Sequence, residues 1–320
     1  MKATEITTKM KEQTIGVEIE MAEITRRDAI GVVAAYYGTE TTIEYEGRGY
    51  SMWTCLDTKG RKWQVMSDGS LHSSVESGGA ELTTPILRYD DIADLQEIVR
   101  RLRRAGAVSN PRHGCGVHIH IGADGHTAQS LRNLTNIMAA HEDLLAAAIY
   151  MDPERRASYC KPTSPEFLRE VNAKKPTTMK ELADIWYETQ PDWRHRSGDH
   201  YHTSRYHMLN LHATFTKGTI EFRLFQFDNP HGGRKGGLHA GRLKAYIHLA
   251  LALSQAAKMV KRANPAKQTT DNPKYAMRCW LLRLGFIGDE FATTRDHLTQ
   301  KLKGDAAFRH GRPERRTDAA

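Results

Sequence analysis

The clearest pattern along the chain is the strict alternation of polar and apolar residues in three short, widely separated segments. These segments are residues 16–20, 116–121 and 219–224. A period of two predicts β-strands, because successive side chains of a strand point to opposite faces. In each segment one face carries charged or imidazole groups, and the other carries aliphatic or aromatic residues. We therefore expect three strands that pack one face on the core and turn the other toward a polar site.

The polar faces carry pairs of charged or metal-binding groups two residues apart. These pairs are Glu18 with Glu20, His118 with His120, and Glu221 with Arg223. Each pair alone fits an exposed strand, where such residues are usually solvated. Three pairs inside strongly apolar strands are a different case, because burying unpaired charges is very costly. Mutual pairing, a bound divalent metal, or both would remove that cost, so the pattern favours one shared metal-binding pocket.

The other segments show further strand-like and helical periodicities. Strands are expected at 41–46, 49–56, 61–66 and 80–84, and a hairpin at 206–215 and 219–227. Helices are expected at about 26–37, 90–104, 127–150, 165–171, 179–187, 236–262, 274–284 and 290–302. Short turns that contain Gly or Asp separate neighbouring strands, which suits antiparallel pairing. An antiparallel sheet with helices outside it predicts an α+β fold.

The composition is that of an ordinary globular protein with a basic surface. Of the 320 residues, 39% are hydrophobic and 26% are charged, and the formal net charge is +8. A basic surface is compatible with anionic partners such as ATP, acidic peptides, cell-wall precursors or nucleic acid. The basic runs at 100–104 and 309–316 are typical of a solvated helix face and a tail, rather than of a nucleic-acid footprint.

The cysteines and the apolar stretches indicate a cytoplasmic protein. The four cysteines are scattered and form no C-x-x-C pair, which argues against a zinc ribbon and fits a reducing compartment. Residues 1–13 are polar and contain no apolar secretion signal. The most apolar long stretch is 243–260, but lysine, histidine and glutamine residues interrupt it. It therefore predicts a core helix and not a membrane span.

Several short motifs, taken in chain order, carry a resemblance to a known family. They occupy 16–20, 63–71, 79–85, 114–120, Arg156 with Tyr159, 205–206 with 209–210, and 219–225. This ordered set resembles the predicted amidoligase family of the carboxylate–amine ligase superfamily, which includes glutamine synthetase and glutamate–cysteine ligase. The resemblance extends over about residues 14–255. Its specificity lies in the order of the motifs, since no single motif is decisive.

The resemblance implies an α+β fold in which a curved antiparallel sheet of about six strands surrounds the active site, with helices packed outside. We expect a catalytic domain at 14–262 and a helical C-terminal extension with a polar tail at 263–320. The implied reaction uses ATP and Mg²⁺ to convert a carboxylate to an acyl phosphate, which an amine then converts to an amide. The expected acid is glutamate-like, a peptide or a cell-wall fragment. Neither a membrane nor nucleic acid is an expected partner, and the sequence carries no signal for an oligomeric state.

The resemblance also assigns roles to particular residues. Its metal-binding positions match Glu18, Glu20, Glu81, His118 and Glu221. His120 matches a position near the transferred phosphate, and Arg223 matches an arginine that holds substrate or phosphate. Arg205, Arg156 and Asn210 are expected to bind the nucleotide.

The proposed reaction needs a base, because a lysine-like amine has a pKa near ~10.4 and is protonated at neutral pH. Asp68 and Glu76 are the candidates, and Asp68 joins His120 and Arg223 in the expected catalytic set. The Asp68-Gly69 pair suits a tight turn equally well.

One long loop is expected to cover the site and to shape substrate choice. It runs from 186 to 207 and is rich in aromatic, histidine and arginine side chains: Trp193, Arg194, His195, Arg196, His200, Tyr201 and His202. Long loops are more often functional than not, although an ordinary surface excursion is the alternative.

Two other functions fit parts of the pattern. The first is a metal-dependent hydrolase in which His118, His120 and a glutamate hold zinc. Three or more glutamates with one or two histidines favour magnesium, whereas catalytic zinc sites lean toward histidine. The second is a basic nucleic-acid-binding protein on a degenerate ligase fold, which the positive charge favours and the missing recognition motif disfavours.

Overall fold

The computed structural model describes residues 3–47, 49–75, 78–190, 202–228 and 237–310. Its centre is a sheet of eight strands in the order β2-β3-β4-β5-β1-β6-β8-β7, and every neighbouring pair is antiparallel. The strands are β1 (Ile15–Thr25), β2 (Glu44–Gly47), β3 (Met52–Leu56), β4 (Lys62–Met66), β5 (Gly78–Thr83), β6 (Val117–Gly122), β7 (Leu209–Asn210) and β8 (Thr219–Phe225). The α+β class and the antiparallel pairing are therefore confirmed, and the expected count of about six strands is corrected to eight.

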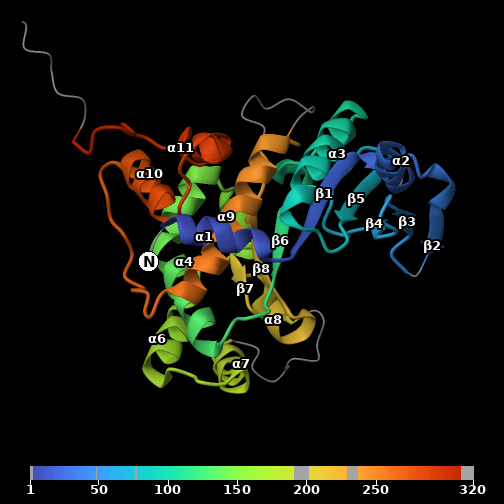
Figure 1. Cartoon of the computed structure of the whole chain (residues 1–320). Helices are drawn as coiled ribbons and strands as arrows, with labels where there is room; N and C mark the ends of the chain where they lie inside the picture. The colour runs from blue at the N-terminus through green and yellow to red at the C-terminus, as the bar shows by residue number, and fades with distance from the viewer. Residues whose placement is uncertain (1–2, 48, 76–77, 191–201, 229–236, 311–320) are drawn as a thin grey trace, which may run out of the picture.

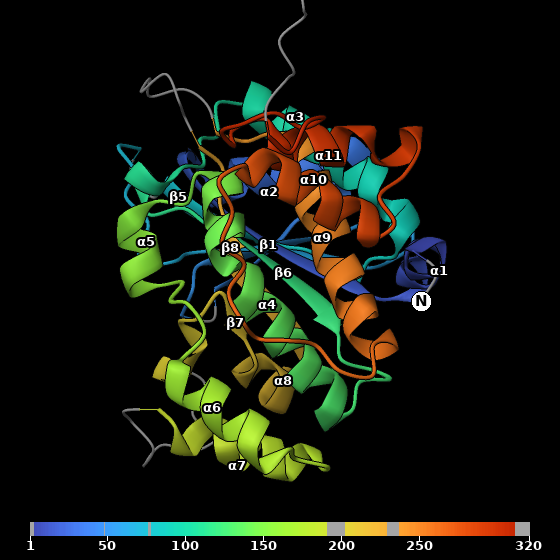
Figure 2. The ribbon, with the colours of Figure 1, turned by 90° about the vertical axis from the view of Figure 1, so that its left-hand side faces the viewer.

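Helices pack around this sheet (Figures 1 and 2). They are α1 (Ala3–Lys9), α2 (Arg26–Tyr37), α3 (Ile92–Arg104), α4 (Ala128–Ile149), α5 (Pro153–Ser158), α6 (Pro165–Lys174), α7 (Met179–Glu188), α8 (His212–Lys217), α9 (Ala240–Met259), α10 (Pro273–Arg283) and α11 (Ala292–Thr299). Side chains that precede several helices fix where they begin. Thr25 accepts a hydrogen bond from the Asp28 backbone at the start of α2, and Thr127 does the same for Ser130 at the start of α4.

The apolar faces of the central strands form the core, as the alternation predicts. Val17, Ile19, Val117, Ile119, Ile220 and Phe222 are all buried. Helix α2 packs against β1, β3, β4 and β5, and α9 packs against β6. The intervening polar residues of β1, β6 and β8 must then point to the opposite face of the sheet.

The expected hairpin at 206–215 and 219–227 is wrong in its first half. Only Leu209 and Asn210 pair with β8, and the chain then turns into the short helix α8. The alternation of 211–216 imitates a strand, but Leu211 and Phe215 are also four residues apart, which places them on one face of a helix. Gly218 ends α8 in the left-handed conformation with φ of 70°. Helices α1 and α5 were not expected from the sequence.

The C-terminal segment packs onto the rest of the molecule, where α10 and α11 lie beside α4 and α9 (Figure 1). The Trp280 ring stacks on His141 of α4, with 3.9 Å between the ring centroids. Met277, Leu281, Phe286 and Leu298 belong to the same buried cluster as the sheet residues. The functional division at residue 262 stays a prediction, but the two parts share one core.

Among the described residues, no helix is both long enough and apolar enough to cross a bilayer. The stretch at 243–260 forms most of α9 and its C-cap, Val260, and the residues from Leu243 to Ala257 are almost all buried.

A buried ion-pair cluster joins the β3–β4 turn to the start of α3 and carries a stability prediction. Asp91 is 3% exposed and accepts hydrogen bonds from Arg61 at 2.8 Å and Lys59 at 2.7 Å. Against the effect of burial, Arg61 and Lys59 hold the pKa of Asp91 well below its usual range. A depressed folded-state pKa stabilises the fold above the unfolded pKa of about 3.9, and this contribution is lost as pH falls.

We expect Asp91→Asn to lower the free energy of unfolding by about 2–3 kcal/mol at neutral pH, because Arg61 then keeps only one of its two buried carboxylate partners, Asp57. The difference from wild type should shrink below about pH 4. Urea unfolding across a pH series measures both effects. Asp90→Asn, at an exposed neighbour, serves as the control and should change stability by less than about 0.5 kcal/mol. Equal effects of the two substitutions would contradict this account.

Candidate active site

The strand register places the expected site residues in a row across the face of the sheet away from α2. The directly opposed residues are Glu20 and Glu81, Glu18 and His118, His120 and Glu221, and Asn210 and Glu221. Between Val117 and Ile119 the pairing of β6 with β8 shifts, because β8 contains an extra residue there. Such bulges re-aim side chains near functional sites. Antiparallel pairing therefore brings together residues as distant in the sequence as Glu18 and Glu221.

One group of potential metal ligands comes from the middle of the sheet. Ligand atoms of Glu18, His118 and Glu221 all lie within 4.8 Å of one another. The Nδ1 atom of His118 is 2.9 Å from Glu18 Oε2 and 3.9 Å from Glu221 Oε1. Asn210 donates a hydrogen bond of 2.7 Å to the second oxygen of Glu221 and so fixes the orientation of that carboxylate.

A second group lies beside the first, toward β5. Ligand oxygens of Glu20, Asp68 and Glu81 also lie within 4.8 Å of one another. The Nε2 atom of His118 is 3.7 Å from Glu20 Oε1, so His118 connects the two groups. Asp68 also makes the turn contacts that its sequence predicted, because its Oδ1 accepts 2.7 Å hydrogen bonds from the backbone and the hydroxyl of Ser70. The turn role of Asp68 is therefore confirmed, and its catalytic role stays a prediction.

The electrostatics of the two groups differ. Burial, and then the charges of Glu18 and Glu20, raise the pKa of Glu81 well above its usual range. Against the effect of burial, Arg223 and then His120 lower the pKa of Glu221 to about 2. The carboxylates around Glu81 thus repel one another, which a divalent cation would relieve. Oxygen-rich ligand sets of this kind suit magnesium.

His120 points to the same face but belongs to neither ligand group. Its Nδ1 lies 2.9 Å from the hydroxyl of Thr219, and its Nε2 lies 3.3 Å from Glu18 Oε1. Burial opposes protonation of this imidazole, but Glu18 and Glu221 together raise its pKa. The protonated imidazole of His120 can therefore donate an N–H hydrogen bond to an anion in the site.

Two buried arginines flank the carboxylates. Arg223 donates to Glu221 Oε1 at 2.7 Å, and the ring of Tyr206 lies 5.7 Å from its guanidinium carbon. Arg155 Nη1 lies 4.0 Å from Glu20 Oε2. Among the described residues, neither Arg155 Nε nor Arg223 Nε has a hydrogen-bond partner. Buried N–H groups are rarely left unpaired, and both guanidinium groups line the pocket described below, so their N–H groups suit an anionic ligand there.

A glycine makes room for Arg155. A Cβ atom added to Gly116 would lie 2.2 Å from Arg155 Nη2, so no larger residue fits there without moving the guanidinium. The backbone N–H of Gly116 also donates to Glu20 Oε2. The Gly-rich start of β6 therefore holds a carboxylate and admits an arginine at the same point.

A pocket of about 350 Å³ opens onto the second carboxylate group. Its walls include Glu20, Asp68, Arg155, Arg205, Tyr206 and Arg223. The expected site residues Arg205 and Arg223 thus face one space together with two of the acidic residues.

Asn210, which holds Glu221, does not line this pocket, and neither does Arg156. Arg156 forms an ion pair with Asp143 of α4 and borders a neighbouring cavity. The adjacent Arg155 occupies the pocket instead, because consecutive residues of a helix point about 100° apart. Asp152 accepts a hydrogen bond from the Arg155 backbone as the N-cap of α5. An Asp-Pro pair at a helix start was the sequence signal that could have set this phase.

Two expected contributors lie outside the described residues. Glu76, the second candidate base, is one of them. Most of the aromatic and basic loop is the other, namely Trp193, Arg194, His195, Arg196, His200 and Tyr201. His202, at the end of that loop, is described and buried, with Nδ1 2.8 Å from the Ser204 hydroxyl.

Comparison with known proteins gives one family match and one similar structure. A bifunctional glutathione synthetase from Pasteurella multocida has 12% sequence identity and a TM-score of 0.46, over 93% of this chain and 48% of that chain. This chain therefore spans about half the length of that protein. No curated protein matches the sequence. A family model described as "putative amidoligase enzyme" matches residues 11–254. The chain therefore belongs to this amidoligase family.

Proposed function

We propose that the protein is an ATP- and Mg²⁺-dependent carboxylate–amine ligase that forms an amide through an acyl phosphate. The observation that carries the proposal is the convergence of two carboxylate-rich groups beside a pocket with two buried arginines. Membership of an amidoligase family supports a ligase.

The ligand groups fit cations of the size and hardness of Mg²⁺. Glu18, His118 and Glu221 would hold one ion, and Glu20 with Glu81 would hold a second. When bound, these ions neutralise the charge that develops on a transferred phosphoryl group. The raised pKa of Glu81 follows from the same crowding of buried carboxylates, which a positive charge would relieve.

Phosphorylation comes first in the proposed reaction. A carboxylate oxygen of the acid attacks the terminal phosphorus of ATP, the bond from that phosphorus to ADP breaks, and an acyl phosphate forms. Arg155 and Arg223 hold the acid by charge-assisted hydrogen bonds in the pocket. His120 donates its N–H to the transferred phosphoryl group. Arg205, at the pocket wall, binds a further phosphate or carboxylate oxygen.

Amide formation follows. The amine nitrogen attacks the acyl carbon, the bond from that carbon to phosphate oxygen breaks, and inorganic phosphate leaves. The amine must lose a proton, and Asp68 is the proposed acceptor because it faces the pocket. Ser70 holds one of its oxygens and so orients the carboxylate.

The zinc hydrolase alternative fits the geometry less well. Each ligand group contains at least two carboxylates, and His120 belongs to neither. Catalytic zinc sites usually have three protein ligands, often with two or more histidines. The nucleic-acid alternative gains nothing from these buried acidic groups, which repel phosphate in the absence of a cation.

An ADP-release screen tests the proposal. Candidate acids and amines are supplied with ATP and Mg²⁺, and products are identified by mass spectrometry. ADP release should require both Mg²⁺ and an acid, and hydroxylamine in place of the amine should trap the acyl phosphate as a hydroxamate. Turnover without nucleotide that a zinc chelator abolishes would instead establish the hydrolase. Mobility shifts of DNA that depend on salt, without ADP release, would favour the nucleic-acid alternative.

A further inference from the structure

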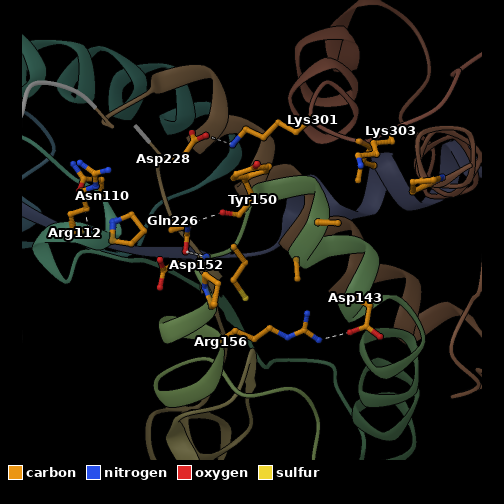
Figure 3. Close-up of a pocket in the computed structure, with 17 residues that line it drawn as sticks. Asn110, Arg112, Asp143, Tyr150, Asp152, Arg156, Gln226, Asp228, Lys301 and Lys303 are labelled. Carbon is orange, nitrogen blue, oxygen red and sulfur yellow. Dashed lines mark hydrogen bonds and ion pairs between the residues drawn. The ribbon is translucent and has the colours of Figure 1, made fainter. Parts of the chain in front are cut away.

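A second and larger cavity adjoins the pocket at the carboxylate groups. Its volume is about 790 Å³, and it shares Pro111, Arg112 and Asp152 with the smaller pocket. The end of α4 and the start of α5 form one side, and Pro273 and residues 301–303 form another (Figure 3). These C-terminal residues lie outside the 11–254 match to the family.

The inner surface of the cavity is largely apolar and includes a strained aromatic residue. Ala146, Ala147, Met151 and Leu302 contribute to it. Tyr150 is 70% exposed and has a left-handed backbone with φ of 58°. A bulky residue rarely adopts this conformation, and here it ends α4 as its C-cap and turns the Tyr150 ring toward the cavity. Gln226 stabilises the turn, because it donates to the Tyr150 carbonyl at 3.1 Å and accepts from the Asp152 backbone at 3.1 Å.

The acidic side chains at the rim of the cavity are paired within the fold, whereas one basic side chain can still bind a ligand. Asp143 pairs with Arg156 and Lys267, and Asp228 pairs with Lys301 and Arg242 (Figure 3). The acidic groups of the rim are therefore neutralised within the fold, and Asp152 is engaged as the cap of α5. Lys303 is exposed, and the described residues offer it no ion-pair partner. The cavity thus presents an apolar surface with an available cation.

We infer that this cavity extends the acid-binding pocket, so that the enzyme takes a peptide-sized acid rather than a single amino acid. The inference rests on the proposed function. The reacting carboxylate lies between Arg155 and Arg223, an apolar middle part packs on Tyr150 and Met151, and a second anionic group meets Lys303. Pockets of some 300–1,000 Å³ enclose ligands of this size, and the two adjoining spaces exceed the needs of one amino acid.

Equilibrium binding of tripeptides to the full chain in the presence of Mg²⁺ tests the inference without requiring turnover. The probes are Glu-Ala-Glu, Glu-Leu-Glu and Glu-Phe-Glu, with free glutamate as the single-residue reference, and calorimetry gives the dissociation constants. We expect at least one tripeptide to bind about tenfold more tightly than glutamate or better. Lys303→Glu should weaken the binding of that tripeptide by about tenfold and leave the affinity for glutamate unchanged, because only the contact with the distant anionic group is affected.

Arg278→Glu is the matched control, since Arg278 is exposed on α10, lies in the same C-terminal segment and does not line the cavity. It should leave all four affinities unchanged. The inference is overturned if no tripeptide binds more tightly than glutamate, or if Lys303→Glu and Arg278→Glu act alike. Tripeptide binding that depends on Lys303 without any ADP release would leave the cavity assignment intact and reject the ligase. ADP release that requires an acid, combined with tripeptide affinities that Lys303→Glu leaves unchanged, would reject the cavity assignment alone.

Discussion

Replacing Glu20 by Gln lowers magnesium-dependent ADP release by on the order of 10³-fold, because the substitution keeps the shape of the side chain and removes a charge from the second ligand group. Glu20 is 4% exposed, and its carboxylate lies near Asp68, Glu81 and Arg155. Gln can still accept the hydrogen bond from the Gly116 backbone, so the fold should persist. The measurement is the steady-state rate of ADP release at saturating ATP and Mg²⁺, with circular dichroism as the check on folding.

Glu12→Gln is the control for this prediction. Glu12 is exposed and lies just before β1. Its substitution therefore removes the same charge without touching the site. It should leave the rate within about twofold, as expected for a surface substitution. A Glu20→Gln protein that keeps more than a tenth of wild-type activity would show that this carboxylate holds no essential cation.

The second large effect is expected at Arg155, whereas its neighbour Arg156, which points away from the pocket, should show almost none. Arg155→Gln should lower kcat/KM for the acid by about 10²-fold, because a buried charge-assisted contact to the substrate is lost. Arg156→Gln should change it by less than about threefold with a single-residue acid, since Arg156 pairs with Asp143 outside the pocket. Varying the acid at fixed ATP and Mg²⁺ measures both constants.

Gly116→Ala provides a second route to the same result. Its added Cβ would displace the Arg155 guanidinium, so kcat/KM for the acid should fall in the same direction. If Arg156→Gln proves the more damaging substitution, the assignment of Arg155 to the acid is wrong.

Much of the fold could be predicted from the sequence, because the alternation of a strand fixes which side chains share a face of the sheet. Glu18, Glu20, His118 and Glu221 were placed on one face by a period of two, and the antiparallel register then brings them together. The core helix at 243–260 could also be predicted, since polar residues interrupt the apolar stretch too often for a membrane span.

What the sequence could not provide depends on contacts between distant or very short elements. Helix α8 has six residues, and over that length alternation and helical spacing are compatible with the same apolar positions. The choice between Arg155 and Arg156 required the phase of a helix that was not expected at all. The cavity beside Tyr150 forms only where the C-terminal segment packs on α4, a contact with no local signal.

The central claim is that the carboxylate groups on this sheet face bind divalent cations. Titration with Mn²⁺, followed by electron paramagnetic resonance of the free ion, tests it most directly because bound Mn²⁺ loses the free-ion signal. The account predicts two ions per chain at millimolar or lower concentrations, competition by Mg²⁺, and the loss of one ion in Glu81→Gln. A wild-type chain that leaves all added Mn²⁺ free would contradict it.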